Sequence, residues 1–96
     1  MTPEGKIKSH VDRVLAKYDE VIWYFKPVQS GYGKRALDYV CCIRGLFVCI
    51  ETKAPGEDLT RYQVITAAQI AQKGGKVWII SQLATVAAFE QWIQRL

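Results

Sequence analysis

The chain has 96 residues, of which 50% are hydrophobic and 11% aromatic, and its formal net charge is +4. This composition excludes an intrinsically disordered chain, and the length predicts a single domain over residues 1–96, whose thin stability margin a homodimer would widen. The basic excess suits a polyanionic partner. The chain starts without a leader-like segment and has no apolar run of bilayer length, so we expect a soluble, cytoplasmic protein with no membrane partner.

The first part of the chain predicts a helix, a strand and a loop. Thr2-Pro3 marks the start of the helix, because Thr is a favoured N-cap and Pro fits the first helical position. Apolar residues from Ile7 to Tyr18 then recur at helical spacing for about four turns. Residues 21–25 are β-branched or aromatic and predict a strand. Residues 29–35 follow as a basic, glycine-rich loop.

Residues 37–43 and 46–52 predict two strands that form a hairpin. They are joined by Arg44-Gly45, a short turn in which Gly supplies a positive φ. Cys41, Cys42 and Cys49 fall within these strands. An odd number of cysteines without a CxxC pair is a poor framework for disulfides or zinc, so we expect reduced and mostly buried thiols.

The last part of the chain predicts a helix, a strand and a final helix. Thr60 and Gln63 form a capping box at the start of the first of these helices, which ends at Gly74-Gly75. Small and apolar residues cover most of its circumference, so we expect it to be largely buried. A strand over 76–80 follows by a right-handed parallel crossover. The predicted fold is α/β, of order α-β-β-β-α-β-α, with a mixed four-stranded sheet flanked by helices.

Three charged residues stand in or beside the apolar hairpin strands: Asp38, Glu51 and Lys53. If the hairpin turns on Arg44-Gly45, Asp38 lies opposite Glu51, with Cβ atoms about 4.5 to 5.5 Å apart. Alternation along the strand places Lys53 on the same face. Neighbouring carboxylates in an apolar setting are costly unless a cation neutralises them. Hard oxygen ligands suit Mg²⁺ or Mn²⁺ acting on a phosphodiester, and no organic cofactor is indicated.

These residues resemble the signature of the PD-(D/E)XK nuclease superfamily, and most closely its virus-type replication-repair nuclease domain, VRR-NUC. The resemblance extends over nearly the whole chain and implies a restriction-endonuclease-like core. The chain has Ala36-Leu37-Asp38 where the family commonly has Gly-x-Pro-Asp. The matching residues are Glu4 in the opening helix, Ser30, Gly31 and Gly33 in the loop, Asp38, the run Glu51-Thr52-Lys53-Ala54, and Gln63 after the second helix start.

The resemblance implies a metal-dependent DNA endonuclease of the phage type. In it, Asp38 and Glu51 hold the metal with the Thr52 carbonyl and Glu4. Lys53 positions or helps to deprotonate the attacking water and stabilises developing charge, and Gln63 orients the site. Standalone members of this family tend to be homodimers that cut branched DNA such as four-way (Holliday) junctions, so the resemblance implies DNA and a second copy of the chain as partners.

Alternatives remain open from the residues alone. Glu4 also fits as a first-turn acid that the helix dipole favours, and Gln63 as the third residue of the capping box. A non-catalytic nucleic-acid-binding or assembly module is the rival function, and a nickase or a nuclease without junction preference is a second. The three tryptophans fit the core better than a base-stacking platform. The candidate DNA contacts lie in the basic loop, where Tyr32 also fits as a packing residue: Ser30, Tyr32, Lys34 and Arg35.

Overall fold

The computed structural model describes residues 1–28 and 34–96. It confirms the predicted order of elements and the mixed four-stranded sheet, in which the strands lie in the order β1-β2-β3-β4. β2 is antiparallel to both β1 and β3, and β4 is parallel to β3. The elements are α1 (Pro3–Lys17), β1 (Ile22–Phe25), β2 (Tyr39–Ile43), β3 (Leu46–Thr52), α2 (Arg61–Gln72), β4 (Lys76–Ile80) and α3 (Leu83–Arg95).

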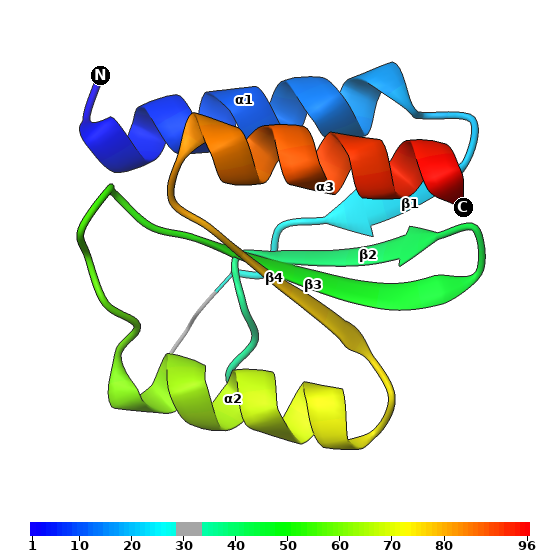
Figure 1. Cartoon of the computed structure of the whole chain (residues 1–96). Helices are drawn as coiled ribbons and strands as arrows, with labels where there is room; N and C mark the ends of the chain where they lie inside the picture. Colours follow the sequence, from blue (N-terminus) through cyan, green and yellow to red (C-terminus); the bar gives the residue numbers. More distant parts are fainter. Residues whose placement is uncertain (29–33) are drawn as a thin grey trace.

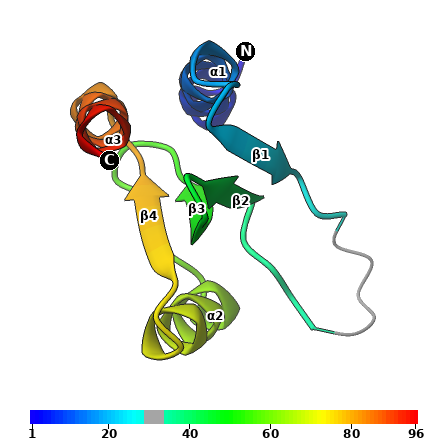
Figure 2. The same ribbon diagram turned by 90° about the vertical axis from the view of Figure 1, so that its right-hand side faces the viewer.

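Helices cover the two faces of the sheet unequally. α1 and α3 lie side by side on one face, while α2 lies alone on the other (Figures 1 and 2). The hydrophobic core fills the space between α1, α3 and the sheet, because the amphipathic stripes of both helices face the inward side chains of all the strands. Its fully buried members include Val11, Leu15, Tyr39, Ile50 and Phe89.

The β2–β3 hairpin has the register that the sequence predicts. Ile43 pairs with Leu46, and Tyr39 pairs with Ile50. Both turn residues have positive φ, 46° at Arg44 and 81° at Gly45, as a type I′ turn requires. This turn matches the twist of the strands and therefore fixes which residues face each other along the hairpin.

The expectation that α2 is largely buried is wrong. None of its residues is buried, because α2 packs mainly against β4 and leaves the β1 and β2 side of its face uncovered (Figure 2). Trp23 and Phe25 of β1 are consequently 65% and 46% exposed. Trp23 is therefore not a core residue, whereas Trp78 and Trp92 pack against the core as predicted.

All three cysteines are free thiols, with Cys41 and Cys49 buried and Cys42 exposed. No helix within residues 1–28 and 34–96 is long and apolar enough to cross a bilayer.

Candidate active site

Asp38 and Glu51 meet at the end of the hairpin opposite its turn. Because Tyr39 pairs with Ile50, Asp38 and Glu51 are the next residues to face each other. The Asp38 main-chain N–H donates to Glu51 Oε1 over 3.1 Å. Glu51 is only 3% exposed, so its carboxylate is fixed at the edge of the core. The predicted opposition of the two acids is confirmed.

Thr52 holds the Asp38 carboxylate with two hydrogen bonds. Its main-chain N–H donates to Asp38 Oδ2 over 3.0 Å, and its hydroxyl donates to the same oxygen over 2.7 Å. Sequence reasoning assigned only the carbonyl of Thr52 to the site and missed its hydroxyl. Strand alternation places this side chain on the face opposite to Glu51, but Asp38 lies in a bend just before β2, where alternation does not restrict its direction.

The charges around Glu51 compete. Burial, and then the nearby negative charge of Asp38, raise the pKa of Glu51 to about 7, while hydrogen bonding to the Asp38 main chain and the ammonium of Lys53 lower it. Lys53 is itself 7% exposed. Two carboxylates and a lysine thus share a poorly hydrated corner of the sheet, where each charge strongly affects the others.

Gln63 connects the site to α2. Its side-chain carbonyl accepts from the Thr60 main-chain N–H over 2.9 Å, and the Thr60 hydroxyl accepts from the Gln63 N–H, so the predicted capping box is present. The amide of the same side chain donates to Glu51 Oε2 over 2.8 Å. Gln63 therefore caps the helix and orients the carboxylate at once, and the two roles that the sequence offered for it coexist.

Lys8 lies between Glu4 and the Asp38 carboxylate. Lys8 Nζ lies 3.8 Å from Glu4 Oε2 and 4.0 Å from Asp38 Oδ2. Thr2 caps α1 as predicted, so Glu4 occupies the first turn of a helix whose start lies at the same end of the sheet as the site (Figure 1). Lys8 is a second residue that sequence reasoning missed. The signal for it is weak, since one lysine among several on α1 carries no distinguishing pattern.

A small cavity of about 180 Å³ opens beside the acids. The guanidinium of Arg35 lies 4.3 Å from the centre of the Tyr62 ring at this opening, a stacked cation–π arrangement. Ser30 and Tyr32, two of the predicted DNA contacts, lie outside the described residues. The cavity is lined by Arg35, Ala36, Asp38, Glu51, Thr60, Tyr62, Gln63 and Thr66.

The donor set fits a hard divalent cation. The carboxylates of Asp38 and Glu51 are close enough for the charge of Asp38, together with burial, to raise the pKa of Glu51, so a cation bound between them would favour the ionised form of both. Within the described ranges 1–28 and 34–96, no three acidic, histidine or cysteine side chains form a metal-binding group. A cation bound there would take two carboxylates and complete its shell with main-chain carbonyl and water oxygens, as Mg²⁺ commonly does.

Comparison with solved structures finds a similar fold. A structure described as a VRR_NUC domain matches the chain with a TM-score of 0.75 and 16% sequence identity, over 95% of this chain and 97% of that chain. No protein-family model matches the sequence, and no curated protein matches it. At this identity the match establishes the arrangement of helices and strands. The chain has a VRR-NUC-like fold.

Proposed function

We propose that the protein is a metal-dependent DNA endonuclease that hydrolyses phosphodiester bonds. The observation that carries this proposal is the pair of facing carboxylates, Asp38 and Glu51, fixed by hydrogen bonds beside the buried Lys53. A protein that only binds DNA gains nothing from two acids there, because without a cation they repel phosphates. The match to a VRR_NUC domain structure supports the proposal.

The chain's own residues prepare the site for Mg²⁺ or Mn²⁺. Asp38 and Glu51 would hold the ion together with the Thr52 carbonyl. The bound ion supplies charge neutralisation at the phosphate and a water of lowered pKa. Thr52 keeps Asp38 in place through its hydroxyl and N–H, and Gln63 keeps Glu51 in place from α2. Glu4, 3.8 Å from Lys8, would contribute from α1 to the outer part of the site.

Lys53 acts on the nucleophile and on the transition state. Lys53 is 7% exposed, and burial strengthens its interaction with nearby anions. It favours the anionic form of an attacking water and stabilises the negative charge that develops on the phosphate oxygens. Because Lys53 directly follows the last residue of β3 and lies two residues after Glu51, one strand positions both the acid and the cation that assists the attacking water.

Basic side chains around the acids bring the DNA backbone to the site. Arg35 lines the cavity beside Glu51, Lys34 precedes it in an exposed segment, and Lys8 lies 4.0 Å from Asp38. Together with the net charge of +4, these cations offset the repulsion between two carboxylates and a polyanion.

The active form is a homodimer that acts on branched DNA. Each copy of the chain supplies one Asp38–Glu51 pair, so two copies related by a two-fold axis would present two sites to the two strands of a symmetric junction. Sedimentation of the purified protein at micromolar concentration tests this step, and a monomer that remains fully active on four-way DNA contradicts it.

The direct test is cleavage of labelled linear, flapped and four-way DNA in Mg²⁺ or Mn²⁺. Wild type should cut four-way DNA in preference to linear DNA, Lys53→Ala should lose at least about 100-fold in rate, and Lys6→Ala, an exposed lysine of α1, should cut like wild type. Failure of wild type to cut any of the three substrates overturns the nuclease assignment and favours a binding module. Equal cutting by Lys53→Ala removes Lys53 from the mechanism, and equal cutting of linear and four-way DNA contradicts the junction preference.

A further inference from the structure

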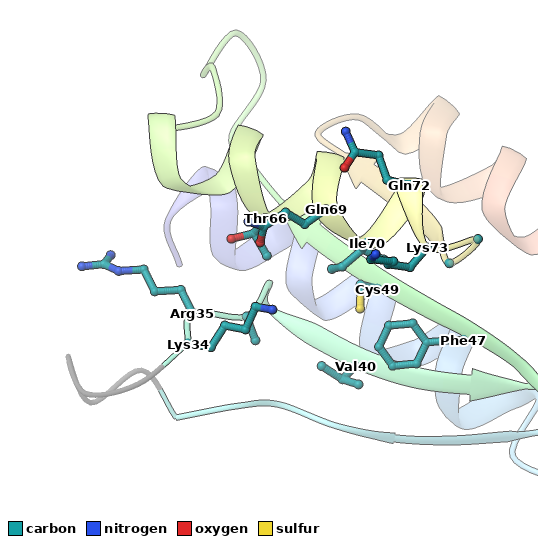
Figure 3. Close-up of a pocket in the computed structure, with 13 residues that line it drawn as sticks. Lys34, Arg35, Val40, Phe47, Cys49, Thr66, Gln69, Ile70, Gln72 and Lys73 are labelled. Carbon is teal, nitrogen blue, oxygen red and sulfur yellow. The ribbon is translucent and has the colours of Figure 1, made fainter.

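A second and larger cavity, of about 640 Å³, lies between α2 and the β2–β3 hairpin (Figure 3). Val40 of β2 and Phe47 and Cys49 of β3 form its sheet side, and Ile70 closes it from α2. Phe47 is 53% exposed, so much of its ring is open to an incoming group. The cavity exists because α2 covers only part of its face of the sheet.

The border of this cavity is positively charged. Lys34 reaches over it from the segment before β2, and Lys73 lies on its α2 side (Figure 3). Arg35 also lines it, while its guanidinium extends away from the cavity (Figure 3) and lies 4.3 Å from the centre of the Tyr62 ring. Among the described residues, the lining contains three cations and no acidic residue. An apolar floor with a cationic border suits a ligand that is flat and apolar at one end and anionic at the other.

The large cavity adjoins the candidate active site. Arg35, Ala36 and Thr66 line both the large cavity and the small one that contains Asp38 and Glu51. A DNA strand that places one phosphate at the two carboxylates therefore brings its neighbouring nucleotide to the mouth of the large cavity. Arg35 lies where the connecting phosphate would pass.

We propose that the large cavity binds one unpaired nucleobase of the DNA substrate, an inference that rests on the proposed nuclease function. The base stacks on the exposed ring of Phe47 above Val40 and Cys49, and its flanking phosphates contact Lys34 and Lys73. Base stacking on an aromatic side chain is tolerant of sequence, so the cavity selects for an unpaired base and not for a particular one. Paired bases remain in the helix and cannot enter.

The charges favour this occupant over a second copy of the chain. In a two-fold contact through this cavity, the same residues face each other across the axis. The three cations of one copy would then face those of the other without an acidic partner in the lining. A nucleotide brings the negative charge that this border lacks.

The test measures binding in EDTA, so that it does not depend on cleavage. The probe is a duplex with a single 2-aminopurine bulge, compared with the same duplex fully paired. Wild type should bind the bulged duplex about tenfold more tightly, the gain expected for one stacked base, and should quench the 2-aminopurine fluorescence. Phe47→Ala should lose most of this preference, and Phe47→Tyr should retain it.

Matched controls separate the cavity from the rest of the surface. Phe25→Ala removes an aromatic side chain of similar exposure on the same face of the sheet and should keep the preference. Lys73→Glu should weaken binding of the bulged duplex more than Arg95→Glu, an exposed position on α3, which lies on the opposite face (Figure 1). Equal effects of the two charge reversals contradict the assignment of Lys73.

The outcomes distinguish this inference from the proposed function. Equal affinity for bulged and paired duplexes, or a preference that Phe47→Ala leaves intact, overturns the base-binding cavity while DNA remains the partner. Lack of binding to either duplex in EDTA overturns the base-binding cavity, while cleavage in Mg²⁺ or Mn²⁺ tests the nuclease assignment separately. A wild type that dimerises, together with a Phe47→Ala variant that is monomeric but keeps the bulge preference, assigns the cavity to self-association and overturns the inference.

Discussion

The hydroxyl of Thr52 donates a 2.7 Å hydrogen bond to the carboxylate of Asp38. Thr52 is completely buried and directly follows Glu51. These two adjacent residues of β3 both contact Asp38: Glu51 accepts from the Asp38 main-chain N–H, and Thr52 donates to the Asp38 carboxylate. The position of Asp38, which lies outside any strand, is thus set by contacts with β3.

Removing the Thr52 hydroxyl should reduce cleavage. Thr52→Val keeps the shape of the side chain but leaves Asp38 Oδ2 with only the main-chain donor at 3.0 Å. We expect a loss of about 1 to 3 kcal/mol in unfolding free energy and a lower single-turnover rate at saturating Mg²⁺. Thr52→Ser retains the hydroxyl and is the control. A Thr52→Val enzyme with the rate of wild type shows that the main-chain bond alone positions Asp38.

Replacing Glu51 by glutamine should stabilise the metal-free protein most at high pH. The pKa of Glu51 is raised from 4.5 to about 7, first by burial and then by Asp38, so between these values the folded state binds a proton that the unfolded chain has lost. The unfolding free energy of wild type therefore falls across this window as the pH rises, and the full penalty is present above about pH 7.

Melting temperatures measured in EDTA test whether the stability of the wild type falls with rising pH in this way. Glu51→Gln should melt higher than wild type at about pH 8, and the difference should shrink toward about pH 5. Glu20→Gln, at an exposed position, controls for the change in net charge. A Glu51→Gln difference that is constant across this range would contradict the burial of a charged Glu51 as the source of the penalty.

Divalent cations should stabilise the wild type against heat and leave the Asp38→Asn variant unaffected. A ligand that binds only the folded state raises its stability by about 2.7 kcal/mol at 100 times its dissociation constant. Melting with and without Mn²⁺ measures this shift, and Asp58→Asn, an exposed acid outside the site, should respond like wild type. Equal Mn²⁺ stabilisation of Asp38→Asn and wild type places the cation elsewhere.

Gln63 and Thr60 allow helix capping to be separated from catalysis. Thr60→Ala removes the cap oxygen of α2 and should cost about 1 kcal/mol of stability, while the 2.8 Å bond from Gln63 to Glu51 remains. Gln63→Ala keeps the bond from the main-chain N–H of residue 63 to the Thr60 hydroxyl, but it loses the other half of the capping box, the bond from the Thr60 N–H, and the bond to Glu51. The two variants should therefore unfold at similar denaturant concentrations, but only Gln63→Ala should cut DNA much more slowly. Similar cleavage rates for the two variants show that Gln63 acts as a cap alone.

The acidic pair was predictable because a two-residue turn fixes the hairpin register, and every step away from Arg44-Gly45 follows from it. The contact between the Thr52 hydroxyl and Asp38 was not predictable, because the alternation of side chains between faces holds only within a strand and Asp38 lies just outside β2. The sequence suggested Gln63 both as a helix cap and as a candidate site residue, and the structure shows that its one side-chain amide contacts both Thr60 and Glu51.

The exposure of α2 also escaped prediction. Its composition indicates how apolar the helix is, but the number of strands beneath it depends on where it crosses the sheet. The exposure of Trp23 was missed for a related reason. A run of aromatic residues predicts a strand but does not indicate whether a helix covers the outer face of that strand.

The least buried helix of the fold supplies the side chain that orients the most critical carboxylate. α2 has no buried residue, so it is expected to detach from the sheet at lower free energy than α1 or α3. Each such opening withdraws Gln63 and leaves Glu51 without its partner amide. The fraction of molecules ready to cut DNA then equals the fraction with α2 docked, and DNA that fills the space beneath this helix would raise that fraction as it binds.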